Sequence, residues 1–239
     1  MNQQQTSDAM KQERTSLMAY LRELPEAAWD KPSLCPGWTI RDVVAHLVGI
    51  VTDVNALNLD GAGSEAVNQR QVDERKDNTI PELFAEWEKE GSQFEAGILQ
   101  QTDEFWDTAF PPFGTVGTAL RRLVEDIYIH AQDIKVALGE EPSDGAGLIP
   151  TLEVVAAELP ERAARLARGV GGVRFDIDGF KETVDVGDGA KVTVSGDAKA
   201  LAFVGTGRTT LDDAIRDGSL SVTPTVPSGL GDALNIYGP

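Results

Sequence analysis

Apolar residues recur at helical spacing through the first 138 residues of the chain. Four stretches carry apolar positions at the i, i+3, i+4, i+7 spacing of an amphipathic helix. We expect helices over residues 7–24, 39–54, 79–101 and 115–138. Because four amphipathic helices joined by long connections are typical of a four-helix bundle, the pattern predicts that fold for the N-terminal part.

Two of these helices have clear start signals. Asp42 follows Thr39 by three residues, and Glu82 follows Thr79 at the same distance, which is the spacing of a capping box. Residues 58–78, between these two helices, are polar and contain glycine. We therefore expect a long connection there, helical in part at most.

The periodicity changes after a segment rich in glycine and proline, residues 140–150, which is the best domain boundary. We expect a bundle over 1–142 and a small α/β domain over 150–239, so the predicted fold class is α+β. Alternating apolar and polar residues separated by glycine-containing turns are typical of antiparallel strands. The expected elements are a helix over 151–168, strands over 173–178, 182–187 and 190–196, short helices over 198–203 and 211–216, and an edge strand over 220–225.

Composition narrows the classes of function. Asp and Glu total 39 against 21 Lys and Arg, a formal net charge of −18. Nucleic-acid binding relies on a basic face, so we expect no nucleic-acid partner. No apolar run approaches the roughly 20 residues of a membrane span, and the N-terminus is polar. We expect a soluble cytoplasmic protein without membrane partners.

The chain contains two histidines, and both fall at the margin of an apolar stripe. Asp126, His130 and Asp133 share one side of a helix, within a sector of roughly 60°. If His46 on the second helix faces them, two imidazoles and one carboxylate converge, which is a common set for a divalent metal with open positions. Asp133 could instead orient an imidazole. The alternative is that the histidines are hydrogen-bonded core residues without a metal. Asp126 and His130, four residues apart, would then form a simple ion pair on one helix.

Other candidates carry weaker signals. Cys35 could be a thiol nucleophile or an extra ligand, but a buried structural cysteine is the simpler interpretation. Trp38 is expected to anchor the turn into the second helix, and the aromatic residues of 105–113 to pack a loop. Arg208 could reach toward an anionic substrate as a catalytic residue, or remain solvated. We expect Arg121 and Arg122 to be surface charges.

Two motifs resemble a known family. The segments SLCPGWTIRDVVAHLVG (33–49) and LVEDIYIHAQDIKVALG (123–139) are similar to the signatures of the mycothiol-dependent maleylpyruvate isomerase N-terminal family, a branch of the DinB-like bundles. Residues 68–91 fit the middle segment of that family. The second half is similar to its α/β C-terminal domain, which has a sterol-carrier-like character. The resemblance therefore covers most of the chain.

The resemblance implies that His46, Asp126 and His130 are metal ligands. Some family members have Glu where this chain has Asp126, and the shorter side chain leaves room for a shifted metal or an intervening water. It also implies a divalent metal, with zinc as our first expectation and nickel or manganese as alternatives, and mycothiol as thiol cofactor or cosubstrate. The partners would then be this small-molecule thiol and an electrophilic substrate.

The preferred hypothesis is an enzyme whose metal stabilises the thiolate, the reactive form of a thiol. Attack on an electrophilic carbon would give either S-transfer or thiol-assisted cis–trans isomerisation, and we favour S-transfer. A metal-dependent hydrolase, in which the open position activates water, is one alternative. A non-catalytic metal- or ligand-binding module is the other.

Overall fold

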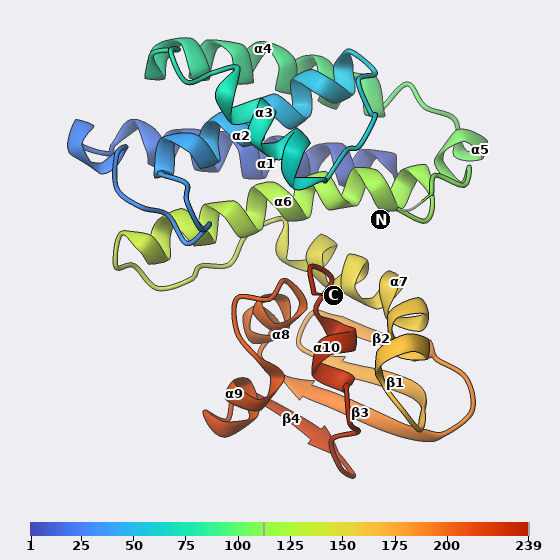
Figure 1. Ribbon diagram of the computed structural model, residues 1–239. Coiled ribbons are helices and arrows are strands. Elements are labelled where there is room, and N and C mark those ends of the chain that lie inside the picture. Colours follow the sequence, from blue (N-terminus) through green and yellow to red (C-terminus); the bar gives the residue numbers. More distant parts are fainter. Residues whose placement is uncertain (112, 239) are drawn as a thin grey trace. The chain divides into compact units, whose positions relative to one another are not determined.

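The computed structural model describes residues 1–111 and 113–238, which form two compact units. The first unit contains residues 1–106 and 126–146, and the second contains residues 107–125 together with the chain from 147 onward. The predicted α+β class is confirmed, because the first unit is helical and the second contains a four-stranded sheet (Figure 1). The limits of independently folding domains, 1–142 and 150–239, stay a prediction. Within the described residues, no helix has the length and apolar character needed to cross a membrane.

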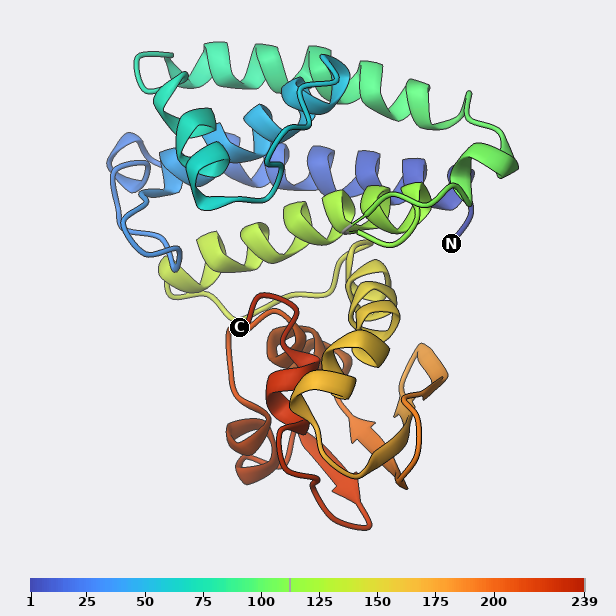
Figure 2. The same cartoon turned by 45° about the vertical axis from the view of Figure 1, so that its right-hand side comes forward.

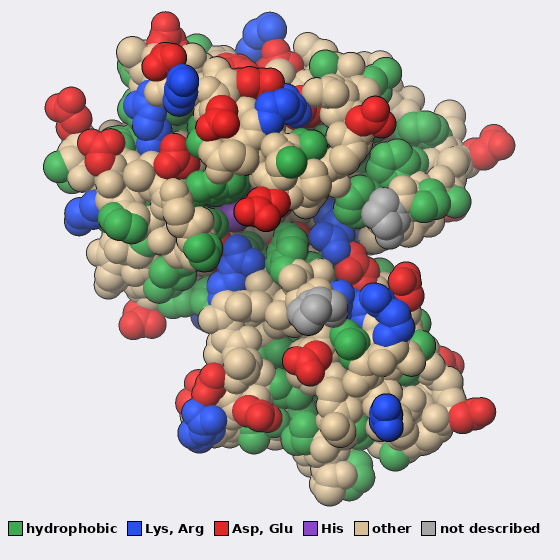
Figure 3. Space-filling model, viewed as in Figure 1, with side chains coloured by type: hydrophobic (Ala, Val, Ile, Leu, Met, Phe, Trp, Pro, Cys, Tyr) green, Lys and Arg blue, Asp and Glu red, His purple; other side chains and the backbone are tan. Residues whose placement is uncertain are grey.

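The first unit is built on the four predicted helices. They are α1 (Gln3–Arg22), α2 (Ile40–Asn55), α4 (Ile80–Ile98) and the second half of α6 (Val116–Ala137). Three shorter helices join them: η1 (Glu26–Ala28), α3 (Glu65–Asp73) and α5 (Asp103–Trp106). Acidic and basic side chains are intermixed over the visible face of this unit (Figure 3), as expected for a solvated surface.

Helix start signals are confirmed where the sequence carries them. In α2, the Thr39 side chain accepts from the backbone N–H of Asp42 while the Asp42 carboxylate accepts from Thr39, and Thr79 forms the same box with Glu82 in α4. The start of α1 differs, because a capping box formed by Asn2 begins this helix at residue 3 rather than 7. The first turn is polar, so hydrophobic periodicity does not reveal it.

The connection between α2 and α4 contains α3, which packs closely against α2. A Cβ added to Gly49 would lie 2.5 Å from Cβ of Gln71, well inside an ordinary carbon–carbon contact. The absence of a side chain at Gly49 therefore lets the two helices approach. This contact brings Gln71 into the core, where it is 3% exposed.

One buried ion pair joins α1 and α4. Arg14 is 2% exposed, and its Nε donates to Oε1 of Glu95 at 2.7 Å while Nη2 donates to Oε2 at 3.2 Å. Two parallel bonds of this kind match the planar guanidinium to the carboxylate. Gly91 gives Arg14 its space, since a Cβ there would lie 2.5 Å from Cδ of the arginine.

The sheet of the second unit differs from the expected antiparallel arrangement. Its strands are β1 (Val170–Ile177), β2 (Phe180–Asp185), β3 (Ala190–Gly196) and β4 (Leu220–Thr223), in the spatial order β2-β1-β3-β4. Strand β1 pairs antiparallel with β2 but parallel with β3. The prediction of purely antiparallel strands was therefore wrong, because alternation reports which face is buried and not the direction of the neighbour. Strand β4 lies at an edge, as predicted.

A four-residue connection, residues 186–189, produces this order by carrying the chain past the start of β1. Neighbouring strands lie about 4.8 Å apart, so the connection crosses roughly 10 Å, which four extended residues can span. The backbones come close at the crossing: a Cβ on Gly189 would lie 2.4 Å from the carbonyl oxygen of Gly169, and one on Gly171 would lie 2.4 Å from that of Gly189. Glycine is required here because a side chain has no room.

Helices cover one face of this sheet. They are α7 (Leu148–Leu166), α8 (Ala198–Gly205), α9 (Leu211–Arg216) and α10 (Leu230–Leu234), of which α10 had no counterpart in the prediction. Figure 2 shows α7 and α10 side by side, and the two are in contact. Val173, Phe175 and Ile177 of β1 are buried, whereas Arg174 between them is exposed.

Candidate metal centre

His46 lies on the core side of α2 and is 3% exposed. The capping box at Thr39 sets the start of the helix, and the apolar stripe that follows turns this part of α2 inward. Nδ1 of His46 lies 2.9 Å from Oε1 of Gln71, and Nε2 lies 3.7 Å from Oδ2 of Asp126. The imidazole also packs against Trp38, with 5.0 Å between ring centroids.

His130 of α6 faces the same point from the opposite helix. Its Nδ1 lies 3.0 Å from Oδ2 of Asp133, and its Nε2 lies 3.5 Å from Oδ1 of Asp126. Because an ionised carboxylate only accepts hydrogen bonds, Nδ1 of His130 is the donor to Asp133. The orienting contact predicted for Asp133 is present, and this carboxylate is 1% exposed.

The three predicted ligands come together as the helix periodicity implied. The ligand atoms of His46, Asp126 and His130 all lie within 4.8 Å of one another. Oδ2 of Asp126 is buried and has no hydrogen-bond partner among the described residues. A buried carboxylate oxygen without a partner is costly, and a cation between the two Nε2 atoms would satisfy it. A small purple patch of histidine is visible in Figure 3, and the two histidines are 3% and 8% exposed.

The spacing of these atoms fits a metal ion. Zinc binds imidazole nitrogen at about 2.0–2.1 Å and carboxylate oxygen at about 2.0–2.2 Å, so tetrahedral angles separate nitrogen from oxygen by roughly 3.4 Å. The two separations found here are 3.5 and 3.7 Å. Both exceed a direct hydrogen bond. The donor set therefore suits a divalent cation, with room for further ligands at the open positions.

The two histidines differ in their electrostatics. Burial lowers the pKa of His46 to about 4, against the opposing effect of Asp126. Burial also disfavours protonation of His130, but the carboxylates of Asp126 and Asp133 outweigh it and hold the pKa of His130 well above its usual value. The site thus attracts positive charge next to Asp126 and Asp133.

Cys35 is closer to this centre than its interpretation as a buried structural cysteine implied. It is partly exposed, and its Sγ lies 3.5 Å from both Nδ1 of His130 and Oδ2 of Asp133. These three residues form a second group whose donor atoms are close enough to hold a cation. The loop before α2 and helix α6 are distant in sequence, so sequence neighbours gave no sign of this contact.

Gln71 is a site residue that the sequence analysis missed. It lies in the segment expected to be a connection, where a glutamine among polar residues carries no signal. Asp53 was the available clue, because a carboxylate within an apolar run requires a buried partner. Nε2 of Gln71 donates to Oδ2 of Asp53 at 2.6 Å.

The candidate arginines belong to the second unit. Arg208 donates from Nη1 to the backbone oxygen of Thr206 at 2.7 Å, and its guanidinium lies over the ring of Tyr237. Its catalytic role stays a prediction. The expectation that Arg121 and Arg122 are surface charges was wrong, since both are largely buried and pair with Glu153 and Glu158 of α7, respectively. These two ion pairs join the first half of α6 to α7 within the second unit.

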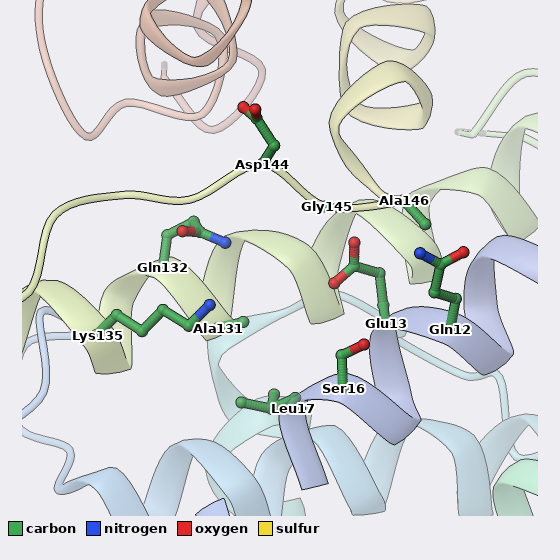
Figure 4. Close-up of a pocket in the computed structure, with 10 residues that line it drawn as sticks. All are labelled: Gln12, Glu13, Ser16, Leu17, Ala131, Gln132, Lys135, Asp144, Gly145 and Ala146. Carbon is green, nitrogen blue, oxygen red and sulfur yellow. The ribbon is translucent and has the colours of Figure 1, made fainter. Parts of the chain in front are cut away.

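A small polar cavity in the first unit is separate from the metal ligands. It has a volume of about 120 Å³ and lies between α1, α6 and the segment around Gly145 (Figure 4). Glu13 and Ser16 of α1 and Gln132 and Lys135 of α6 contribute polar groups to it. Ligand pockets for small organic molecules usually measure about 300–1,000 Å³, so this cavity is too small for a thiol cosubstrate and its electrophile.

Comparison with known proteins identifies the family. The sequence profile of the mycothiol maleylpyruvate isomerase N-terminal domain matches residues 10–135, which is 126 of the 239 residues. The chain belongs to this family. The resemblance seen in the two histidine motifs is therefore confirmed, and both motifs' histidines lie within the matched segment.

Two solved structures share the fold of almost the whole chain. The crystal structure of a mycothiol-dependent maleylpyruvate isomerase aligns with a TM-score of 0.64, and that of a histidine-to-alanine mutant of such an enzyme with 0.61. Each alignment covers 96% of both chains at 15% sequence identity. At this identity the likeness concerns the fold. No curated protein matches the sequence.

Proposed function

We propose that this chain is a metal-dependent, mycothiol-dependent isomerase of a small electrophilic molecule. The observation that carries the proposal is the convergence of two imidazole Nε2 atoms on the carboxylate of Asp126, whose buried Oδ2 has no hydrogen-bond partner among the described residues. Membership of the family and the names of the similar structures favour isomerisation over the S-transfer that the sequence analysis preferred. S-transfer is the second candidate, because it requires the same activated thiol.

A divalent metal, zinc in our proposal, would supply thiolate at neutral pH, since coordination lowers the pKa of a bound thiol. The protein's own residues would bind and orient this metal. His46, His130 and Asp126 would be the ligands, and Asp133 fixes the ring of His130 through Nδ1. Trp38 packs against His46 in a tilted arrangement, with 5.0 Å between the ring centroids. Three protein ligands leave positions for a thiol, as in catalytic metal sites.

Arg208 is proposed to bind an anionic group of the substrate. The chain carries a net charge of −18, which repels anions unless a local cation offsets it. A guanidinium binds carboxylates with two parallel hydrogen bonds. Replacement Arg208→Gln is expected to raise KM for an anionic substrate while metal content stays unchanged.

The first experiment measures metal content by plasma mass spectrometry after reconstitution with zinc, nickel or manganese. We expect about one equivalent in wild type and its loss in a folded His46→Ala/His130→Ala variant. Lys11→Ala, at an exposed position of α1, is the control. Wild type that binds none of the three metals would refute the proposal.

The second experiment assays cis–trans isomerisation of maleylpyruvate with and without mycothiol. Turnover that requires both the metal and the thiol is the expected result. A stable thiol adduct would indicate S-transfer, and thiol-independent conversion of the substrate to a hydrolysis product would indicate a metal hydrolase instead. Metal binding without any turnover would favour the non-catalytic module.

A further inference from the structure

A chain of hydrogen bonds connects His46 to a carboxylate that is remote from the metal ligands. Nδ1 of His46 lies 2.9 Å from Oε1 of Gln71, and Nε2 of Gln71 lies 2.6 Å from Oδ2 of Asp53. Gln71 is 3% exposed and Asp53 is 9% exposed. Both bonds are therefore sheltered from water, where their loss is costly.

The direction of these bonds follows from Asp53. An ionised carboxylate only accepts, so the group of Gln71 that faces Asp53 is the amide nitrogen. The amide oxygen of Gln71 then faces His46 and needs a donor. Nδ1 of His46 must carry the hydrogen, which leaves the lone pair on Nε2, the atom that points toward Asp126.

Other contacts hold Asp53 and Gln71 in place. Arg70 donates from Nη2 to Oδ2 of Asp53 at 2.7 Å, and Asn58 donates to Oδ1 at 2.9 Å. The backbone oxygen of Gln71 accepts from Nη1 of Arg75 at 3.0 Å. Each of the three hydrogen-bonded residues His46, Gln71 and Asp53 is thus held by at least two contacts, which is what an orienting group requires.

We propose that Gln71 is a positioning residue of the metal centre, which together with Asp53 holds His46 as the Nδ1–H tautomer and aims its Nε2 at the metal. The proposal rests on the metal centre of the proposed function. It assigns the short helix α3 a task in the site, and it gives His46 a partner equivalent to the one that Asp133 provides for His130.

The tautomer can be measured without metal or substrate. The chain has only two histidines, so nitrogen-15 NMR of histidine-labelled, metal-free protein yields few signals, and a His130→Gln variant assigns them. We expect His46 as the neutral Nδ1–H form in wild type. Gln71→Met keeps an unbranched side chain of similar length but removes both hydrogen bonds, so His46 should shift to the Nε2–H form. Gln71→Glu retains an acceptor and should restore the Nδ1–H form.

Metal affinity gives the second readout. We expect Gln71→Met to weaken zinc binding by about 10–100-fold, the usual effect of losing such a partner. Gln100→Met makes the same chemical change at an exposed position and should bind zinc like wild type. If Gln71→Met does not fold, Asp53→Asn replaces it, because an amide there no longer selects the orientation of Gln71 and should give a mixture of tautomers.

The outcomes separate this proposal from the proposed function. An unchanged tautomer and unchanged zinc affinity in Gln71→Met would overturn the positioning role even if wild type binds metal. Wild type that binds no metal but has His46 as the Nδ1–H form, lost in Gln71→Met, would refute the metal centre and leave the hydrogen-bond chain standing.

Discussion

Replacement of Gly49 by alanine tests whether the close contact of α2 and α3 is needed for the site. Two effects of opposite sign compete. Alanine has a higher helix propensity than glycine by about 0.8–1.0 kcal/mol in a helix interior, which would stabilise α2. The new Cβ, however, would lie 2.5 Å from Cβ and 2.7 Å from Cγ of Gln71.

The steric effect should win. An ordinary contact begins near 3.4 Å, so α3 would have to move by about 0.9 Å, the difference from 2.5 Å. Atoms close to the backbone of Gln71 cannot rotate away, and overpacking of this kind costs about 1–3 kcal/mol. We expect a net loss of roughly 0–2 kcal/mol, centred near 1 kcal/mol, in the free energy of unfolding. The same shift would stretch the bond from His46 to Gln71 and weaken zinc binding by about tenfold.

Urea denaturation followed by helical circular dichroism measures the free energy of unfolding, and zinc titration measures the metal affinity. Gly97→Ala is the matched control, because this glycine also lies in a helix but a Cβ there would meet nothing within 4 Å. The control should be as stable as wild type or up to about 1 kcal/mol more stable. Gly49→Ala with a raised urea midpoint and wild-type zinc affinity would refute the reasoning.

Three further predictions concern stability. Arg14→Met should lower the free energy of unfolding by about 3–5 kcal/mol by leaving Glu95 buried without its partner, and adding Glu95→Leu should recover part of the loss in urea denaturation; no recovery would contradict the pairing. Burial would raise the pKa of Asp53, but hydrogen bonds from Gln71 and Arg70 lower it, so its carboxylate stabilises the fold at neutral pH and loses this effect as the pH falls below the unfolded value near 3.8. The stability difference between wild type and Asp53→Asn should therefore shrink in acid. A difference independent of pH would contradict a stabilising role of the ionised Asp53 carboxylate. A chelator should lower the Tm of zinc-loaded wild type, by an amount equivalent to about 2.7 kcal/mol at a zinc concentration 100 times Kd, but should leave the double histidine variant unchanged.

Much of the first unit could be predicted because local rules act within single helices. The boxes at Thr39 and Thr79 fix helix starts, and periodicity of 3.6 residues per turn places His46 and His130 beside the buried stripes. Once the two stripes face one core, the histidines meet. Their roles as ligands stay a proposal, since spacing and geometry bring donors together without supplying the ion.

The remainder depends on contacts between segments far apart in the chain. Gln71 is recognisable only after α3 packs on α2, and Cys35 only after its loop reaches α6. The burial of Arg121 and Arg122 requires α7, which begins more than 20 residues later. The parallel pairing of β1 with β3 was missed for the same reason, because a short glycine-containing connection looks like a hairpin turn whether or not the chain crosses to the other side.

The crossing at residues 186–189 has a consequence for synthesis on the ribosome. Strand β1 lies between β2 and β3, so a nascent chain that has emerged only as far as residue 189 can form the β1–β2 hairpin but leaves the other edge of β1 open. Val173, Phe175 and Ile177 lie along that strand, and an apolar strand with an open edge readily pairs with other chains. Pairing of β3 closes this edge, so the interval before residues 190–196 emerge is one in which the nascent chain is open to pairing with other chains.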